Sequence, residues 1–197
     1  MKLWDIEQEY RTQGYSIICG TDEAGAGPLA GPVYAAAVIL PFELEIKGLN
    51  DSKKVSPKKR ETLFSVICEA AEAYAIVSID ETEIDETDIL RARLKAMDLA
   101  VKQLSIRPDL ALIDGNRDQG IECPHALVVE GDSKSANIAA ASILAKVSRD
   151  RFMVEMDSRY PGYGFAKHKG YGTPQHFEAL RRLGPCPLHR RTFLKNL

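Results

Sequence analysis

Apolar and polar residues are distributed along the chain in a pattern that predicts an α/β protein. Short apolar runs bounded by glycine, proline or acidic residues predict strands at residues 15–20, 33–40, 73–79, 110–113 and 126–129. Longer segments with helical spacing or a capping residue predict helices at residues 3–13, 57–73, 90–104, 134–158 and 174–184. We expect residues 80–88 to be an acidic linker. A short Gly/Pro-rich turn joins the first two strands and predicts an antiparallel hairpin within a mixed sheet flanked by helices.

Two adjacent carboxylates, Asp22 and Glu23, follow the first predicted strand and precede the loop Gly25-Ala26-Gly27. Neighbouring residues of a strand point to opposite faces, so one of the two carboxylates would face the core. An unpaired, ionised carboxylate is very costly there. We therefore expect the strand to end or bend at this pair, or a cation to meet it. The glycines would allow another molecule to approach the main chain closely, which favours metal-dependent chemistry on nucleic acid.

Residues 25–30 also match the dinucleotide-binding pattern G-x-G-x-x-G/A. That pattern requires a helix to begin at the glycines, whereas Pro32 and a β-type run follow here. Asp22 and Glu23 would also repel a pyrophosphate. We interpret the match as a coincidence; the alternative, a dinucleotide-dependent oxidoreductase, would bind NAD without a divalent metal.

Two further acids, Asp114 and Asp132, follow later apolar runs. Each has a local explanation, as a turn residue or as a helix N-cap. If the strands belong to one sheet, however, these acids could converge with Asp22 and Glu23, and their mutual repulsion would call for a cation. Oxygen ligands suit Mg²⁺ or Mn²⁺, and two such ions about 4 Å apart can support in-line phosphodiester cleavage.

Composition and charge narrow the class of protein. A length of 197 residues suits one domain, and contents of 45% hydrophobic and 27% charged residues are those of a globular protein. No apolar run approaches the ~18 residues of a membrane span and the N-terminus is unlike a signal peptide, so we expect a cytoplasmic protein. The four cysteines and four histidines show no metal-ligand spacing. Any metal should therefore be held by oxygen.

The C-terminal third differs from the rest of the chain. Residues 133–197 carry 12 Lys/Arg against 4 Asp/Glu, whereas residues 1–132 carry 14 against 24. Within residues 162–172, glycines alternate with Tyr163, Phe165 and Tyr171, with basic residues between them. This mixture suits stacking on a base or sugar beside phosphate contacts, although charge alone is equally consistent with a solvated surface.

Six motifs in this order resemble those of bacterial ribonuclease HII, a family of the ribonuclease H-like fold. They are residues 22–33, 51–53, 112–115, 131–135 with 138–150, 168–173 and 188–193, and together they cover nearly the whole chain. The resemblance implies one catalytic domain over residues 1–197, with residues from about 160 as a substrate-binding extension. It also implies a divalent-metal-dependent endoribonuclease that cuts the RNA strand of RNA–DNA hybrids and incises 5′ of ribonucleotides in duplex DNA. Its products would carry 3′-hydroxyl and 5′-phosphate ends, and its roles would lie in ribonucleotide excision repair and DNA replication.

The resemblance also assigns roles to residues. Asp22, Glu23, Asp114 and Asp132 would bind two Mg²⁺ or Mn²⁺ ions and act in catalysis, and Tyr171 would stack on the ribose at the junction. The other residues implied to contact substrate are Gly25, Ala26, Gly27, Lys53, Ser133 and Lys134. The family usually carries Arg or Lys where this chain has Ala26, so we expect reduced affinity or rate with junction preference partly retained.

Three alternatives stay open at this point. A related nuclease of the same fold could act on all-DNA junctions, which stacking of Tyr171 on a ribose argues against. A non-catalytic hybrid-binding protein is conceivable because of Ala26, and Asp22→Asn would distinguish it from an enzyme. The third is the oxidoreductase above. No partner motif is evident and we expect a monomer.

Overall fold

The computed structural model describes residues 3–49 and 55–195. Its centre is a five-stranded mixed sheet, as the sequence predicts, and the strands are in the order β3-β2-β1-β4-β5. β1 pairs antiparallel with β2 and parallel with β4. β3 is antiparallel to β2, and β5 is parallel to β4. The strands are β1 Ile18–Ala24, β2 Val33–Ile39, β3 Ala73–Ile79, β4 Leu110–Asp114 and β5 His125–Val128.

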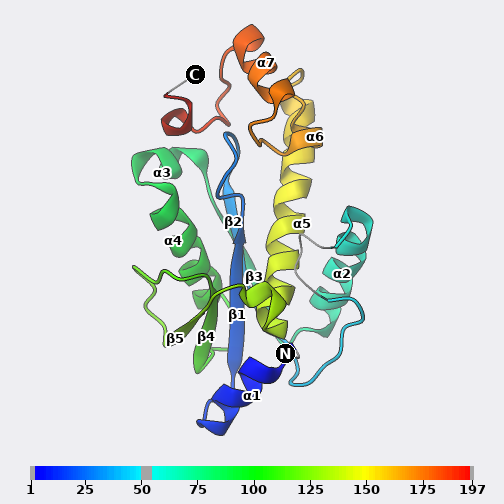
Figure 1. The fold of residues 1–197 in the computed structure, drawn as a ribbon, viewed down its shortest axis with the longest axis vertical. Helices are drawn as coiled ribbons and strands as arrows, with labels where there is room; N and C mark the ends of the chain where they lie inside the picture. The colour runs from blue at the N-terminus through cyan, green and yellow to red at the C-terminus, as the bar shows by residue number, and fades with distance from the viewer. Residues whose placement is uncertain (1–2, 50–54, 196–197) are drawn as a thin grey trace.

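Helices cover both faces of this sheet (Figure 1). α4 packs on one face, and α5 with α2 packs on the other. α1 lies at one end of the molecule, and α6, α7 and the C-terminal segment lie at the other (Figure 1). The helices are α1 Asp5–Thr12, α2 Pro57–Ala70, α3 Glu81–Glu86, α4 Ile89–Lys102, α5 Ala136–Arg159, α6 Phe165–His168 and α7 Pro174–Leu183, with short 3₁₀ turns η2 Gly131–Ser133 and η3 Arg191–Leu194.

One local prediction was wrong, and two other segments are defined more closely by the structure. The expected acidic linker contains α3, because Asp80 caps a helix by accepting a hydrogen bond from the Glu83 amide at 2.9 Å. Asp132 is not the N-cap of the long helix: Ser135 is, and it accepts from the Ile138 amide. The glycine-rich stretch after residue 160 contains the short helix α6, in keeping with the expected C-terminal extension.

The long helix α5 lies very close to β1 because of a glycine. A Cβ atom on Gly20 would lie 2.2 Å from the Ile138 amide nitrogen, so only glycine permits this approach. The alanines of α5, which are fully buried, complete the close packing. The distance between this helix and the strand that carries Asp22 and Glu23 is thereby fixed.

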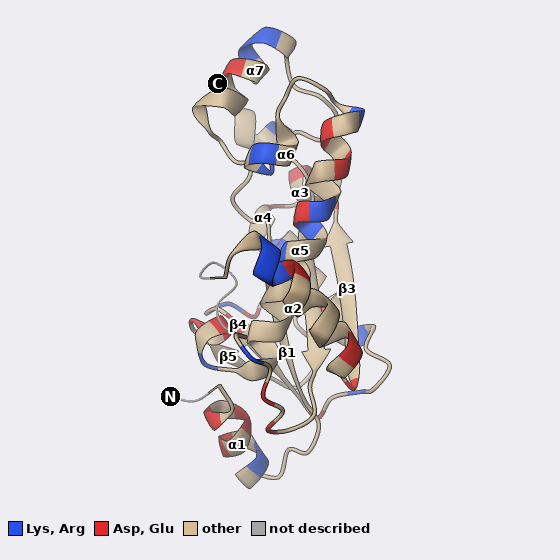
Figure 2. Ribbon diagram, turned by 90° about the vertical axis from the view of Figure 1, so that its right-hand side faces the viewer, with Lys and Arg blue, Asp and Glu red and all other residues tan. Residues whose placement is uncertain are grey.

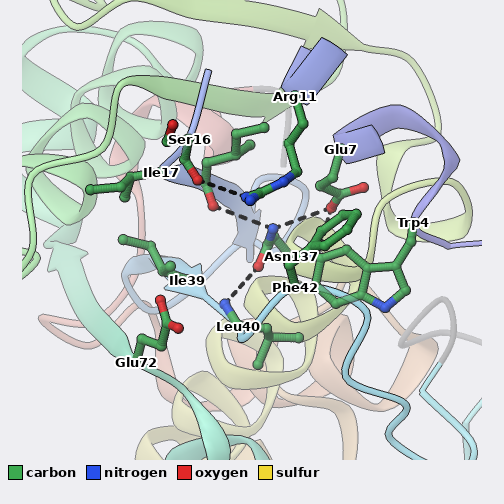
Figure 3. A pocket seen from close by; sticks show the side chains of 11 residues that line it. Trp4, Glu7, Arg11, Ser16, Ile17, Ile39, Leu40, Phe42, Glu72 and Asn137 are labelled. Carbon is green, nitrogen blue, oxygen red and sulfur yellow. Dashed lines mark hydrogen bonds between the residues drawn. The ribbon is translucent and has the colours of Figure 1, made fainter. Parts of the chain in front are cut away.

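Buried Glu7 ties α1 to the start of α5 (Figure 3). Its Oε1 accepts hydrogen bonds from the Ser135 hydroxyl at 2.6 Å and from the Asn137 amide and side chain at 3.2 Å. Asn137 in turn accepts from the Leu40 amide at 2.8 Å, which links the helix to the end of β2. Burial raises the pKa of the Glu7 carboxyl. Within the described residues, no helix is long and apolar enough to cross a membrane.

Candidate active site

β1 does not end at its two carboxylates. It continues to Ala24, and Asp22 and Glu23 are opposite Ala36 and Ala35 of β2. The two side chains therefore leave opposite faces of the sheet, as strand geometry requires. Asp22, which is buried, accepts a hydrogen bond from Ser142 of α5. Glu23 turns toward α4, where Arg93 Nη1 donates to its Oε1 at 2.9 Å. Of the expected alternatives, a cation at the pair is the one observed.

Asp114 reaches the same place from the neighbouring parallel strand. β4 is paired with β1 so that Ile113 lies opposite Thr21, which puts Asp114 level with Asp22 at the ends of the two strands. Its Oδ1 accepts a hydrogen bond from the Gly131 amide at 2.7 Å. Asp22, Glu23 and Asp114 line one cavity of about 240 Å³, together with residues 24–27, Ser142, Lys146, Arg149 and Tyr171.

Burial and crowding change the pKa values of Asp22 and Glu23. Burial raises the pKa of Asp22 well above its usual range, and the nearby Glu23 and Asp114 carboxylates raise it further. Burial also raises the pKa of Glu23; the Arg93 guanidinium opposes this shift without cancelling it. Either protonation of the carboxyl groups or a bound cation would relieve the repulsion between them.

Two buried arginines hold the glycine loop over the cavity. Arg190 donates to the carbonyls of Ala26 at 3.0 Å, Gly25 at 2.6 Å and Gly31 at 2.7 Å. Arg149 of α5 donates to the carbonyls of Ala30, Pro32 and Lys169, each at 3.0 Å. Gly25, with φ of 99°, packs so tightly on Arg149 that a Cβ would lie 2.1 Å from its Nε. The loop is therefore a rigid, preorganised element.

Tyr171 completes one side of the cavity. Its ring is 45% exposed and would lie 3.8 Å from a Cβ placed on Gly27, which is also exposed. The ring is held near the loop because Gly170 accepts a hydrogen bond from the Leu29 amide at 2.9 Å. An exposed aromatic face beside an accessible glycine is a suitable surface for stacking on a sugar or base.

Comparison with known proteins assigns this arrangement to a family. The family model described as Ribonuclease HII matches residues 19–196. The chain belongs to the ribonuclease HII family. It is 54% identical over 191 residues to the ribonuclease HII of Geotalea uraniireducens, covering 97% of this chain and 88% of that one. It is 50% identical over 194 residues to that of Caldicellulosiruptor bescii, covering 98% and 94%.

A solved structure agrees with the fold. The crystal structure of ribonuclease H2 from Pyrococcus horikoshii OT3 matches with a TM-score of 0.74 at 28% identity, covering 90% of this chain and 93% of that one. The predicted ribonuclease H-like fold is thereby confirmed, and the chain is a ribonuclease H of type 2.

The remaining predicted residues of this ribonuclease lie outside the cavity or outside the described residues. Asp132 is buried in η2, next to the Gly131 that donates to Asp114, and does not line the cavity. Ser133 and Lys134 bond to the local carbonyls of Glu130 and Val129. Lys53 and the rest of its motif, residues 51–53, are not among the described residues.

Several residues of the site were missed in the sequence. Ser142, Lys146 and Arg149 of α5 all line the cavity. Their spacing of four and then three residues in an otherwise alanine-rich helix was a usable signal, because such positions share one helix face. Lys146 pairs with Asp150 at 2.5 Å, and burial lowers its pKa. Arg93 and Arg190 gave no such signal, since their partners are distant in sequence.

The donor set suits a hard divalent cation. It consists of carboxylates, the ligands that Mg²⁺ and Mn²⁺ prefer, and their repulsion is what such an ion would relieve. In the described part of the chain, however, no three Asp, Glu, His or Cys side chains are yet arranged around one metal position. One visible reason is that Glu23 is directed to Arg93.

Proposed function

We propose that this ribonuclease HII hydrolyses the RNA strand of RNA–DNA hybrids and incises 5′ of single ribonucleotides in duplex DNA, leaving 3′-hydroxyl and 5′-phosphate ends. Family membership implies the activity on hybrids. The observation that supports the catalytic part is the meeting of Asp22, Glu23 and Asp114 in one cavity with the glycine loop and Tyr171.

We assign the four acids as the residues that hold divalent ions. Asp22 and Asp114 enter the cavity from adjacent parallel strands, Glu23 would join them, and Asp132 would complete the set from η2. When bound, two Mg²⁺ or Mn²⁺ ions would activate a water and stabilise the leaving oxygen. Burial of Asp22 beside Ser142 keeps its carboxylate oriented without a competing side-chain cation among the described contacts.

Recognition of the ribose is assigned to the glycine loop and Tyr171. Arg190 and Arg149 fix the main chain of residues 25–32, so the loop requires little ordering when a sugar binds. The Tyr171 ring would stack on the ribose at the junction. Ala26, which lines the cavity, leaves the loop conformation intact but provides no positive charge beside the scissile phosphate.

The basic C-terminal part would grip the nucleic acid. Lys and Arg lie on α5, α6 and α7 (Figure 2), and we assign residues from about 160 as a substrate-binding extension of one domain spanning residues 1–197. Ser133, Lys134 and Lys53 would contact the backbone. Because one chain contains all four acids, we propose that the enzyme acts as a monomer. We also propose that it acts in the cytoplasm.

The test is cleavage of a duplex that contains one ribonucleotide, compared with an RNA–DNA hybrid and an all-DNA duplex, in Mg²⁺, Mn²⁺ or chelator. Mapping of the ends should give one cut 5′ of the ribonucleotide, no cut in all-DNA, and no cut with chelator. Asp22→Asn should lower the rate by at least about 10³-fold while hybrid binding remains. Metal-independent cutting, or cutting of the all-DNA duplex, would exclude the proposal; binding without any cutting would favour the non-catalytic alternative.

A further inference from the structure

Arg93 is the cation that meets Glu23, and its surroundings set it apart from the other arginines of the site. It lies on α4, which contributes no lining residue, whereas the cavity is lined from the sheet, α5 and the two loops. The guanidinium is bonded to Glu23 Oε1 through Nη1, and the side chains of Arg93 and Glu23 are 25% and 11% exposed. Its Nε is buried and has no hydrogen-bond partner within the described residues. Glu23 is thus the side chain that holds this guanidinium.

The position of Glu23 on the strand explains why this contact matters. Asp22 faces α5 and Glu23 faces α4, because adjacent residues of a strand point to opposite faces of the sheet. Glu23 lines the cavity with Asp22 and Asp114, but its Oε1 is held by Arg93, so this oxygen can coordinate a shared ion only after the guanidinium is displaced. As long as the ion pair holds, the described residues offer no complete metal position.

We propose that Arg93 is a positioning residue that occupies Glu23 Oε1 in the free enzyme, so that a divalent ion must displace the guanidinium before this oxygen can coordinate it. This inference depends on the proposed role of Glu23 as a metal ligand. It predicts that the free enzyme binds metal weakly, and that the acids assemble fully only when ion binding is strong enough to break a charged hydrogen bond.

The test measures binding of Mn²⁺ alone to the full chain, by calorimetry or by the spin-resonance signal of free Mn²⁺, with no nucleic acid present. Arg93→Gln should tighten Mn²⁺ binding by about tenfold, because release of one charged hydrogen bond corresponds to that factor. Arg91→Gln is the matched control: it removes the same charge from the same helix at a side chain that is 78% exposed, and it should leave the affinity unchanged.

A double-mutant cycle separates this mechanism from a general effect of charge. In the Glu23→Gln background the additional change Arg93→Gln should give no gain, because there is no carboxylate to release. A gain that persists in that background would show that Arg93 acts only by long-range repulsion, and would overturn the proposal. Equal or weaker Mn²⁺ binding by Arg93→Gln alone would overturn it as well.

A second variant and a cleavage assay provide independent tests of the proposal. If Arg93→Gln does not fold, Arg93→Met retains an unbranched apolar side chain on α4 and carries the same expectation. In cleavage assays the Mn²⁺ concentration for half-maximal rate should fall in the Arg93 variant, whereas a merely structural role would raise it. Failure of the proposed function would appear differently, as wild-type enzyme that binds Mn²⁺ but cuts no ribonucleotide-containing duplex.

Discussion

Two buried histidines near Tyr171, His176 and His189, should make the stability of this enzyme depend on pH in a specific window. His176 Nδ1 lies 2.9 Å from the Tyr171 carbonyl, and because a carbonyl only accepts, this nitrogen carries the proton. The His176 Nε2 is then an acceptor, so His189 Nε2, 3.0 Å away, must donate. The His189 Nδ1 is left to accept from the Cys186 amide at 3.0 Å. In this arrangement both rings are neutral, as the lowered pKa values of His176 and His189 require.

The magnitude follows from the pKa of His189. This ring is 1% exposed; burial, and then the neighbouring His176, lower its pKa to about 4, whereas the Cys186 carbonyl near Nδ1 offsets only part of the shift. Between about pH 4 and 6.5 the unfolded chain therefore binds a proton that the folded chain does not. The stability from this group is fully present above pH 6.5 and is lost as pH falls, by ~2 kcal/mol at pH 5 and ~3 kcal/mol in total. Burial also lowers the pKa of His176, which acts in the same direction.

The assay is urea unfolding of the wild type and His189→Gln from pH 7.5 to pH 4.5. Other groups titrate here too: the raised pKa values of Asp22 and Glu23 act with the opposite sign. Their contribution cancels in the difference between the two proteins. That difference in free energy of unfolding should shrink by ~2 kcal/mol between pH 7.5 and 5. A constant difference would refute the assignment of a neutral, tautomer-specific pair.

Two further predictions concern the glycine loop. Ala26→Arg should raise the rate on a single-ribonucleotide duplex, because it adds a cation in the cavity without changing a main chain that Arg190 already fixes; an unchanged rate would contradict this. Arg190→Ala should lower the free energy of unfolding by about 3–5 kcal/mol, since buried carbonyls of the loop lose a charged donor. Urea unfolding measures this free energy, with the exposed Arg191→Ala as the control. A decrease below about 1 kcal/mol would exclude a role of Arg190 in holding the loop.

Much of the fold was predictable because its signals are local. Each predicted strand exists, and caps such as Ser56 and Thr173 begin helices where their side chains predict them. The errors came from polar segments. Residues 80–88 have the composition of a linker, yet Asp80 caps a short helix and Asp85 accepts from the Thr192 amide at 2.9 Å. Contacts between residues so far apart cannot be seen in a window of sequence.

The candidate site also combines features with a local sequence signal and contacts between residues distant in sequence. That Asp22 and Asp114 meet was predictable, because parallel strands of one sheet end at one edge. The arginines that hold the loop were not predicted, because Arg149 and Arg190 bond to main-chain carbonyls. Every residue has such a carbonyl, so the sequence does not show which residues are the partners. Arg190 and its partner Gly31 are 159 positions apart. The basic C-terminal third, interpreted as a polyanion-binding region, thus also contains a cation with a structural role.

The adjacency of Asp22 and Glu23 explains why this site draws on both layers of helices. Two consecutive strand residues cannot point to one face, so a pair of acids at the end of β1 necessarily faces α5 with one member and α4 with the other. Each helix layer provides a partner for one carboxylate. The neutral Ser142 of α5 donates a hydrogen bond to Asp22, and the cationic Arg93 of α4 pairs with Glu23. On the proposed role of these acids as metal ligands, Asp22 would be available to an ion, whereas Glu23 would stay paired with Arg93 until an ion displaced the guanidinium. On this proposal, the free enzyme would keep Glu23 neutralised by Arg93, and the site would become complete only when a bound ion drew the two carboxylates together.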